Sequence, residues 1–402
     1  MKILVVCQYY YPENFQITPI CEELASKGNE VTVLTGLPNY PIGIVPNEYK
    51  KGKRDEYINN VHVIRCYEVG RKSGIFYLAL NYLSFYISAS HHILKQNEKF
   101  DLVFIYQLSP ILMGVPACKY AKKYKLPLFL YCCDLWPESI KMYIRNENNL
   151  IFRIFKHISK KVYSSCDEIA VQSYSFISYL STIHQINEKN IIYLPAFADE
   201  SYLQMNFESK NDIVDFVFLG NLGIAQNLIA VLESIKLIRE KKGFKVHFVG
   251  DGTCLKEMKA YVKENNLEDI VEFYGRRPVE EMVKFYTLAD VCIVSLKSDN
   301  KTGLTLPSKV QGYMAAGKPI IGMIDGDTKK VIKDSKCGIC VPAGDIDGFS
   351  RAMVYLIDNK NILKELGTNA RDYFKKKYRK KMFIDCLEKE FNKLRRNYND
   401  NI

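Results

Sequence analysis

The chain has 402 residues, of which 48% are hydrophobic and 25% charged, a composition typical of globular proteins and unlike that of disordered or collagen-like chains. Its length indicates two or three domains, each large enough to bury a core. The formal net charge is +11. Residues 1–200 contribute +4 (22 Lys and Arg minus 18 Asp and Glu), whereas residues 364–396 contribute +7 (12 minus 5).

The basic excess lies near the C-terminal end of the sequence. The run consists of Lys375, Lys376, Lys377, Arg379, Lys380 and Lys381. Such a run either forms a solvated helix face or attracts an anionic partner. Because the chain carries no RNA- or DNA-binding motif, we prefer anionic lipid to nucleic acid as that partner.

The 12 cysteines indicate a reducing compartment. Most lie in apolar runs, as Cys7 and Cys292 do, and these are interpreted as small buried residues. Cys337 and Cys340 form one CxxC without a second pair, which favours two strand residues beside a glycine over a zinc or redox site. The first residues, MKILVVCQYYYPE, lack the cleavage site of a signal peptide, so we expect a cytoplasmic protein.

Short apolar runs alternate with helical stretches along the first 200 residues. Strands are predicted at 2–7, 30–35, 101–106, 127–132 and 168–171, and helices at 17–27 and 113–124. The alternation restarts after an aperiodic linker at 194–210. Strands are then predicted at 214–219, 245–249, 271–274, 291–295 and 320–323, and helices at 227–241, 255–265, 280–288, 309–316 and 349–357.

This alternation predicts the α/β class, with two doubly wound parallel sheets. We expect an N-terminal domain at 1–200, a second domain at 201–380, and a C-terminal helix at 381–402 that packs back on the first domain.

The segment 74–94 contains no Asp, Glu, Lys or Arg and is rich in Tyr and Phe. A buried core helix and an interfacial membrane helix explain it equally well, and a membrane span ranks last because Asn81 and several serines and histidines interrupt it. The basic amphipathic stretch 151–161 is a second candidate for an interface, although a core-facing helix is the simpler interpretation.

Parallel sheets bind ligands at the carboxyl ends of their strands, where this chain places several glycine-rich turns. The candidates in the second domain are Gly220, Asn221, Gly223, Gly250, Arg276 and Arg277. Glycine lets backbone N–H groups approach a phosphate, although tight turns need glycine in any case.

The most informative segment is 306–321, LPSKVQGYMAAGKPII. Ser308 and Lys309 open a predicted helix, where Ser308 is either an N-cap or a phosphate ligand. A lysine at the positive end of a helix dipole is unfavourable unless an anion lies there. A diphosphate would supply that anion.

This segment resembles the donor-binding helix of glycosyltransferase family 4, which has the GT-B fold. Further matching segments are YPEN at 11–14, GNEVTV at 28–33, TGLPNYP at 35–41, DLWPES at 134–139, GNLGIAQ at 220–226, LADV at 288–291 and PAGD at 342–345. Together they cover nearly the whole chain. They are similar to the branch that contains N-acetyl-L-fucosamine transferases of capsule and O-antigen biosynthesis.

The resemblance implies two Rossmann-like domains facing across a cleft and a retaining transfer from a UDP-sugar. The leaving phosphate would help to deprotonate the acceptor, a mechanism that needs cations on the diphosphate more than a protein base. The implied donor set is Gly220, Asn221, Gly223, Gln226, Gly250, Arg276, Ser308, Lys309, Asp327 and Thr328, with Lys301 and Thr302 as loop candidates. Asp134, Lys309 and Arg277 are the candidate catalytic residues.

The chain departs from the family in two places. Family 4 usually has two Glu eight positions apart, where this chain has Leu304 and Gly312. A His common after the fourth strand is replaced by Tyr106 and Gln107, which argues against a His-based role and leaves Asp134 as the preferred polar group. An N-cap or salt-bridge role for Asp134 is nearly as plausible.

The implied acceptor is a sugar linked to polyprenyl diphosphate, held by Glu13, Asn14, Gln16 and Glu138. The sugar transferred would be an N-acetylated 6-deoxyhexose such as N-acetyl-L-fucosamine. An enzyme with a hydrophobic acceptor would contact the anionic inner face of the cell membrane peripherally, without spanning it.

No metal or other cofactor is expected. Asp345 and Asp347 spell DxD but precede a predicted helix and are interpreted as an N-cap turn, and the six His show no ligand spacing. Two rival functions remain: a UDP-sugar 2-epimerase of the same architecture, which the few His argue against, and a non-catalytic partner protein derived from the fold.

Overall fold

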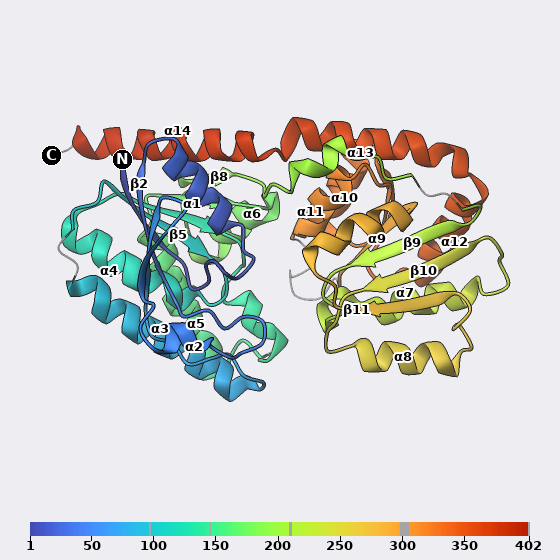
Figure 1. Cartoon of the computed structure of the whole chain (residues 1–402), viewed down its shortest axis with the longest axis horizontal. Helices are drawn as coiled ribbons and strands as arrows, with labels where there is room; N and C mark the ends of the chain where they lie inside the picture. Colours follow the sequence, from blue (N-terminus) through green and yellow to red (C-terminus); the bar gives the residue numbers. More distant parts are fainter. Residues whose placement is uncertain (96–97, 145, 209–210, 298–304, 401–402) are drawn as a thin grey trace. The chain divides into compact units, whose positions relative to one another are not determined.

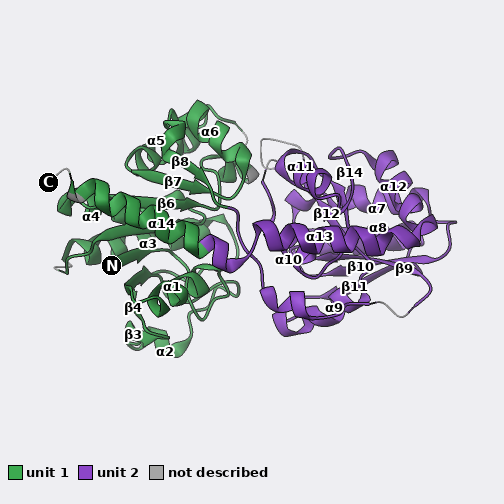
Figure 2. Cartoon of the chain, turned by 90° about the horizontal axis from the view of Figure 1, so that it is seen from above, with its two compact units in different colours: residues 1–194, 384–402 green, residues 195–383 purple. Residues whose placement is uncertain are grey.

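The computed structural model describes residues 1–95, 98–144, 146–208, 211–297 and 305–400. The chain divides into two compact units, which Figure 2 colours separately. Unit 1 comprises Met1–Leu194 and Ile384–Ile402, and unit 2 comprises Pro195–Phe383. The two α/β units are Rossmann-like, as the alternation of strands and helices predicted.

Unit 1 is built on one sheet. Its strands are β1 (Lys2–Val6), β2 (Glu30–Thr35), β3 (Asp55–Ile58), β4 (Val61–Arg65), β5 (Leu102–Gln107), β6 (Leu128–Cys132), β7 (Glu168–Val171) and β8 (Ile191–Tyr193). Within the described part of the chain the order is β3-β4-β2-β1-β5-β6-β7-β8. All neighbours are parallel except β3 and β4. β5 and β6 are buried along their whole length, which explains their continuous apolar runs.

Helices cover both faces of this sheet. They are α1 (Ile17–Ser26), α2 (Asn47–Lys50), α3 (Ile75–Lys95), α4 (Gly114–Tyr124), α5 (Leu150–Ser164), α6 (Tyr174–His184) and most of α14 (Lys380–Asn399). Figure 1 shows α3, α4 and α5 on one face, and α1 with α14 on the other. Right-handed crossovers explain this division, because the chain moves one way across the sheet through α1 and the opposite way through α3, α4 and α5.

Unit 2 is built on a second parallel sheet. Its strands are β9 (Val214–Leu219), β10 (Phe244–Val249), β11 (Val271–Gly275), β12 (Val291–Ser295), β13 (Ile320–Met323) and β14 (Gly338–Val341). The described strands follow the order β11-β10-β9-β12-β13-β14, with every neighbour parallel. Alternate residues of β9 serve two cores: Phe216 and Phe218 pack on one face of the sheet, and Val217 and Leu219 on the other.

The helices of unit 2 lie between and after these strands. They are α7 (Leu228–Leu237), α8 (Leu255–Glu264), α9 (Met282–Leu288), α10 (Ser308–Ala315), α11 (Gly326–Ser335), α12 (Ile346–Asp358) and α13 (Leu363–Lys377). Single 3-10 turns occur at η1 (Ile111–Met113), η2 (Glu138–Met142), η3 (Glu188–Asn190), η4 (Glu200–Gln204), η5 (Ile224–Gln226), η6 (Val279–Glu281) and η8 (Lys360–Ile362).

Most predicted elements lie within a few residues of those observed. The helix predicted at 227–241 ends earlier, at Leu237, and the linker predicted at 194–210 contains a 3-10 turn. The N-cap interpretation of Asp345 is confirmed, since its carboxylate accepts the Gly348 N–H at 2.8 Å. The sequence places domain boundaries after residues 200 and 380, whereas the structure divides after Leu194 and Phe383.

The segment predicted at 74–94 forms α3, one side of which is core. Asn81, Phe85, Ala89 and Ile93 are buried along that side. None of the helices in the described residues is long and apolar enough to cross a membrane. The interpretation of this segment as a membrane span is therefore wrong. All 12 cysteines are free.

Candidate functional site

The chain reverses its direction across the unit 2 sheet between β9 and β12. From β9 it proceeds outward to β10 and β11, and it then returns to the other side of β9 to form β12. The loops that leave the carboxyl ends of β9 and β12 therefore diverge, and ligands of parallel sheets bind where such loops separate. The predicted donor residues Gly220, Asn221, Gly223 and Gln226 lie on the loop after β9.

Two glycines allow the backbone to pack closely at this edge. Gly220 donates its N–H to Val249 O at 2.9 Å, and Gly250 donates to Gly275 O at 2.9 Å. Gly250 has φ +147°, and a Cβ there would lie 1.8 Å from Gly220 O. The position thus accepts no side chain, and the strand ends remain bare backbone.

The loop after β9 rests on the loop after β10. Leu222 donates its N–H to Asp251 O, and Cys254 donates to Leu222 O, both at 2.9 Å. Gly223 is buried against the Asn221 side chain, whose Nδ2 would lie 2.7 Å from a Cβ at position 223. These contacts fix the backbone of the predicted donor loop.

Lys309 reaches this edge from the start of α10. Its Nζ donates to Gln226 Oε1 at 2.8 Å and lies 3.8 Å from the centroid of the Phe218 ring. The same atom would be 3.2 Å from a Cβ at Gly220, whose backbone has φ +133°. The structure therefore brings together three residues of the predicted donor set, Gly220, Gln226 and Lys309.

The Lys309 ammonium is held without a counter-charge. Burial lowers the pKa of Lys309 to about 7. In the described part of the chain no carboxylate forms an ion pair with it, and its hydrogen-bond partner Gln226 is neutral. An anion at this position would supply the missing charge and restore the pKa.

Tyrosines fix α10 beneath this site. The buried Tyr313 hydroxyl accepts the Leu219 N–H at 3.1 Å and lies 3.3 Å from both Leu219 O and Ile293 O, which ties α10 to the end of β9 and the middle of β12. At Gly312, one of the two departures from the family pattern, a Cβ would lie 2.9 Å from the Tyr286 hydroxyl. Tyr286 thus occupies the space that a longer side chain would need.

Ser308 does not cap α10. It is the exposed first residue of the helix, and the N-cap position belongs to Pro307, which makes no side-chain cap. The N-cap interpretation of Ser308 is therefore wrong, because the helix starts one residue earlier than predicted. The hydroxyl remains available to solvent.

The two arginines lie on the loop after β11, an edge strand that β10 separates from β9. Both are exposed. Arg277 Nε donates to Tyr274 O at 3.1 Å, and its Nη1 lies 3.9 Å from Glu281 Oε2. Neither Arg276 nor Arg277 contacts Lys309 in the described structure.

Asp327 and Thr328 lie in the first turn of α11. The buried Thr328 hydroxyl donates to Thr305 O at 3.1 Å, so it holds the chain immediately before α10. Lys301, Thr302 and Leu304 lie outside the described residues.

Asp134 follows β6 in unit 1 and has a fixed orientation. Its Oδ2 accepts the Ser109 hydroxyl at 2.8 Å, and Ser109 Oγ accepts the indole N–H of Trp136 at 3.0 Å. Gln107 Nε2 donates to the Asp134 carbonyl at 2.9 Å. Burial raises the pKa of Asp134 above its ordinary value, with hydrogen bonds from Ser109 acting in the opposite direction.

The carboxylates of two predicted acceptor residues already have partners within the protein. The Glu13 carboxylate is buried and accepts the N–H groups of Asn39 at 2.8 Å and Tyr40 at 2.6 Å, and burial raises the pKa of Glu13 to about 7. Glu138 is also buried. Its Oε2 lies 2.7 Å from Lys141 Nζ, and its Oε1 accepts the Tyr179 hydroxyl at 2.9 Å.

The other two acceptor candidates are more accessible. Asn14 is exposed, and Gln16 is partly exposed at the N-cap position of α1, where its side chain makes no cap hydrogen bond.

Sequence reasoning missed a buried polar cluster at the carboxyl edge of the unit 1 sheet. Gln8 Nε2 donates to Glu68 Oε2 at 3.1 Å and to Asn81 Oδ1 at 2.9 Å, and Asn39 Nδ2 donates to Glu68 Oε1. Burial raises the pKa of Glu68 well above its ordinary value. Asn81 was a signal that could have indicated this cluster, since a buried amide needs a hydrogen-bond partner.

The described residues contain no group of three or more His, Cys, Asp or Glu that could hold a metal ion. At the unit 2 site the structure brings together a lysine ammonium, an amide and bare backbone. Such a set suits a phosphate-bearing ligand.

Comparison with known proteins identifies the family of the chain. Residues 204–373 match the model described as glycosyl transferases group 1, and residues 16–202 match the model described as glycosyltransferase family 4. The chain belongs to glycosyltransferase family 4. It is thus a member of a family of transferases, and the matched residues include nearly all of both units.

Individual relatives are distant. The probable glycosyltransferase WbjE of Pseudomonas aeruginosa is 24% identical over 248 residues, which are 58% of this chain and 60% of the relative. A Campylobacter jejuni enzyme is 25% identical over 230 residues, 56% of this chain and 60% of the relative. Its name is GalNAc-alpha-(1->4)-GalNAc-alpha-(1->3)-diNAcBac-PP-undecaprenol alpha-1,4-N-acetyl-D-galactosaminyltransferase. These matches span about 60% of each relative's length.

The fold is that of the GT-B glycosyltransferases. The structure of HepE from Anabaena in complex with UDP and glucose superposes with a TM-score of 0.71 at 12% identity, over 98% of this chain and 99% of the other. The predicted fold class is confirmed. The N-acetyl-L-fucosamine transferase branch is not established by these comparisons.

Proposed function

We propose that this protein is a retaining glycosyltransferase of bacterial polysaccharide biosynthesis that uses a UDP-sugar. The observation that supports this most directly is Lys309, a partly buried cation that has no counter-charge among the described residues and lies beside bare backbone at Gly220 and Gly250. A nucleoside diphosphate would neutralise it. The UDP complex of the similarly folded HepE supports the choice of nucleotide.

In the proposed reaction the acceptor hydroxyl oxygen bonds to the anomeric carbon while the bond from that carbon to the diphosphate breaks. The hydroxyl proton passes to the leaving phosphate. Lys309 stabilises the negative charge that develops there, and Arg276, Arg277 and Ser308 remain candidate further ligands. Asp134, whose carboxylate Ser109 orients, is proposed to bind the acceptor.

We further propose an N-acetylated 6-deoxyhexose such as N-acetyl-L-fucosamine as the sugar and a sugar on polyprenyl diphosphate as the acceptor. The acceptor proposal is supported by the Campylobacter jejuni relative, whose name specifies an undecaprenol-linked substrate. No metal is required in this scheme, because Lys309 and backbone dipoles carry the charge stabilisation. EDTA should leave transfer unchanged, and loss of activity that Mg²⁺ restores would contradict this.

Peripheral contact with an anionic membrane on its cytoplasmic side is proposed through α3. Its outer side carries Phe76 (68% exposed), Leu83 (46%) and Ile87 (62%), which lie on one stripe of the helix. Lysines border this stripe: Lys72 Nζ lies 5.4 Å from the Tyr77 ring, and Lys119 Nζ lies 5.1 Å from the Tyr86 ring. Exposed apolar residues bordered by lysines are typical of interfacial helices.

The donor is tested first. A thermal-shift panel of UDP-, GDP- and dTDP-sugars identifies the nucleotide, and mass spectrometry with lipid-linked acceptors then detects transfer. We expect UDP to raise the melting temperature and a sugar-extended lipid to form. Interconversion of UDP-sugars without an acceptor would indicate a 2-epimerase, and the absence of any UDP effect would indicate a non-catalytic protein.

Membrane contact is tested by sedimentation with phosphatidylglycerol vesicles. The double variant Phe76→Ser, Ile87→Ser should remain in the supernatant, whereas the wild type sediments. The control is Leu237→Ser in unit 2, which removes an equally exposed leucine (56%) far from α3 in the sequence. Unchanged sedimentation of the α3 variant would contradict the proposal.

A further inference from the structure

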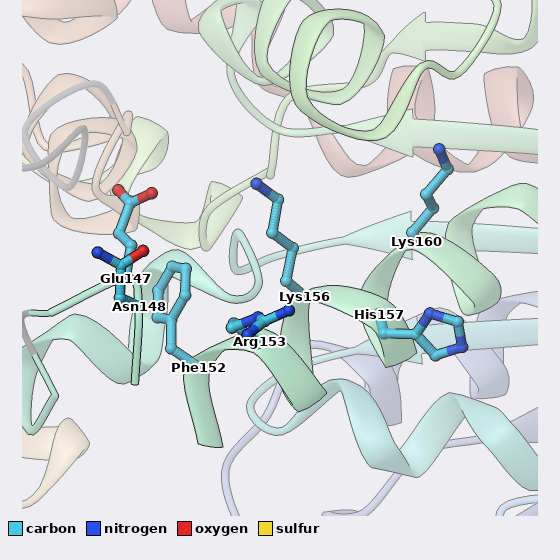
Figure 3. Close-up of a pocket in the computed structure, with 7 residues that line it drawn as sticks. All are labelled: Glu147, Asn148, Phe152, Arg153, Lys156, His157 and Lys160. Atoms are coloured by element: carbon cyan, nitrogen blue, oxygen red, sulfur yellow. The ribbon is translucent and has the colours of Figure 1, made fainter. Parts of the chain in front are cut away.

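A cavity of about 380 Å³ lies along α5 in unit 1, and it is lined by none of the predicted donor residues. Its lining combines basic and amide groups with one aromatic ring. The residues are Glu147, Asn148, Phe152, Arg153, Lys156, His157 and Lys160. Figure 3 shows the long side chains of Lys156 and Lys160 extended to the same side of the helix.

The basic groups of this cavity exceed the acidic ones. Its carboxylate, Glu147, is already paired, because Glu147 Oε1 lies 2.6 Å from Lys141 Nζ. Lys160 Nζ donates to the neutral Gln185 Oε1 at 2.6 Å. In the part of the chain that the structure describes, no carboxylate lies within ion-pair distance of Arg153 or Lys156.

The positive charge of this cavity also affects the pKa of a neighbouring side chain, His184. His184, at the end of α6, is buried, and its Nε2 donates a hydrogen bond of 2.9 Å to Trp136 O. Burial, together with the charges of Lys156 and Lys160, lowers the pKa of His184 to about 4. The two ammonium groups are thus close enough to the same region to act together on one ligand.

The spacing of the cations suits an extended anion. Arg153, Lys156 and Lys160 follow each other by three and four residues, so they form one row on the helix. The row extends about 10 Å along the axis, which is longer than one phosphate needs. Two linked phosphates could therefore contact more than one of these side chains at once.

The opposite flank of α5 is apolar. Leu150 is 70% exposed, and Ile151 and Ile154 are 47% and 48% exposed. The basic row borders α6, as the contact of Lys160 with Gln185 shows, so the apolar flank faces away from α6. One helix therefore presents cations on one side and a lipid-compatible surface on the other.

We propose that this cavity binds the diphosphate group of a prenyl diphosphate, the lipid carrier of the acceptor sugar. The inference rests on the proposed lipid-linked acceptor and deepens it by assigning the group that anchors the carrier. Arg153 and Lys156 contact the phosphates, Lys160 extends the row, and the prenyl chain leaves across Leu150, Ile151 and Ile154.

The test measures binding directly in the full chain, with UDP present at saturation so that the donor site is filled. Isothermal titration calorimetry with farnesyl diphosphate should show binding by the wild type. Arg153→Gln and Lys156→Gln should each weaken it about tenfold, since each removes a charged contact. Lys122→Gln is the control, because it removes an exposed lysine of α4 in the same unit, outside the cavity, and should bind normally.

Farnesol and phosphatidylglycerol vesicles separate the possible sources of the signal. Farnesol lacks the diphosphate and should not bind, and farnesyl diphosphate should displace any vesicle contact made by Arg153 and Lys156. Equal affinity of the wild type, Arg153→Gln and Lys156→Gln for farnesyl diphosphate would overturn the proposal. So would loss of vesicle binding in these variants without competition by farnesyl diphosphate, which would identify a phospholipid headgroup as the ligand.

This test is independent of sugar transfer. If the diphosphate binds at Arg153 and Lys156 but no sugar is transferred to any lipid-linked acceptor, the proposed function fails and the binding site stands. If transfer occurs but the Arg153 and Lys156 variants bind the diphosphate normally, the proposed function stands and the proposed binding site fails.

Discussion

At the residue scale, Lys309 illustrates a cation placed for a ligand at the expense of stability. Its ammonium lies against the Phe218 ring and Gln226 and has no carboxylate partner in the described structure. Burial disfavours the charged form, so the folded apoprotein carries an electrostatic cost that a diphosphate would remove.

Replacement of Lys309 by Met tests this balance. Lys309→Met keeps an unbranched side chain that is only one atom shorter and removes the charge, so the apoprotein should melt no lower than the wild type at pH 6. UDP affinity should fall by about 2 kcal/mol, roughly thirtyfold, because a charged contact is lost. Differential scanning fluorimetry with and without UDP measures both effects. Lys284→Met, which changes an exposed lysine of α9, should alter neither, and a normal UDP shift in Lys309→Met would exclude the diphosphate role.

Because Lys309 titrates near neutral pH, we expect UDP binding to depend on pH. The pKa of Lys309 is about 7 in the free protein, and a bound diphosphate raises it, so binding above pH 7 takes up a proton. UDP affinity should therefore fall as the pH rises from 7 to 9, by up to about tenfold per pH unit. Calorimetry in buffers of different ionisation enthalpy measures the proton uptake. An affinity that stays constant over this range would contradict a titrating Lys309, and Lys309→Met should lack the uptake.

Single residues differ in how well the sequence predicts them. Lys309, Gly220 and Gln226 are predicted because a local motif and the strand-end rule both select them. Glu13 and Glu138 are selected by the same rule, but each carboxylate also has a distant partner: Asn39 lies 26 positions from Glu13, and Tyr179 lies 41 positions from Glu138. Long-range pairing of this kind has no local signature.

At the element scale, the strand ends of unit 2 depend on glycine at position 250. Gly250→Ala combines φ +147° with a Cβ that would lie 1.8 Å from Gly220 O, so the donor loop must move. We expect a loss of about 2–4 kcal/mol in the free energy of unfolding, together with weaker UDP binding. Urea unfolding and UDP titration measure these effects.

Gly243→Ala is the matched control for that variant. Gly243 also has a positive φ, +84°, but nothing lies within 4 Å of a Cβ there. It should cost about 1 kcal/mol and leave UDP binding intact. Equal losses in the two variants would show that backbone strain, rather than the contact with Gly220, determines the effect.

Helix α3 shows where prediction from sequence ends. The absence of charge in 74–94 predicts a helix, but both a core and an interface remain compatible with its composition. The structure shows a core side at Phe85 and Ala89 and an exposed stripe at Phe76, Leu83 and Ile87. The buried side of α3 is determined by its packing against α4 and by the polar cluster of Gln8, Glu68 and Asn81. These contacts join distant parts of the chain, so the exposed stripe could not be predicted from the sequence of the helix.

At the scale of the whole molecule, the chain leaves unit 1 after Leu194 and re-enters it at Ile384. Within unit 1, α14 packs on the sheet through Phe391, whose ring lies 5.4 Å from that of Phe104 and 5.1 Å from that of Phe129. The fold class follows from the alternation of strand and helix patterns, and the C-terminal helix was expected as well. The residues that dock this segment do not, because any of its apolar side chains could have served.

Each unit has its own core, so a change in one core should act on that unit first. Phe391→Ala removes a fully buried ring from unit 1 and should cost about 3–5 kcal/mol, which lowers the unfolding temperature of that unit by about 10 °C. Phe374→Ala removes an equally buried ring of α13 and should destabilise unit 2 instead. Differential scanning calorimetry of the full chain with UDP assigns the transitions, because UDP should raise only the transition that Phe374→Ala lowers. A single transition that both variants and UDP shift together would show that the units unfold as one.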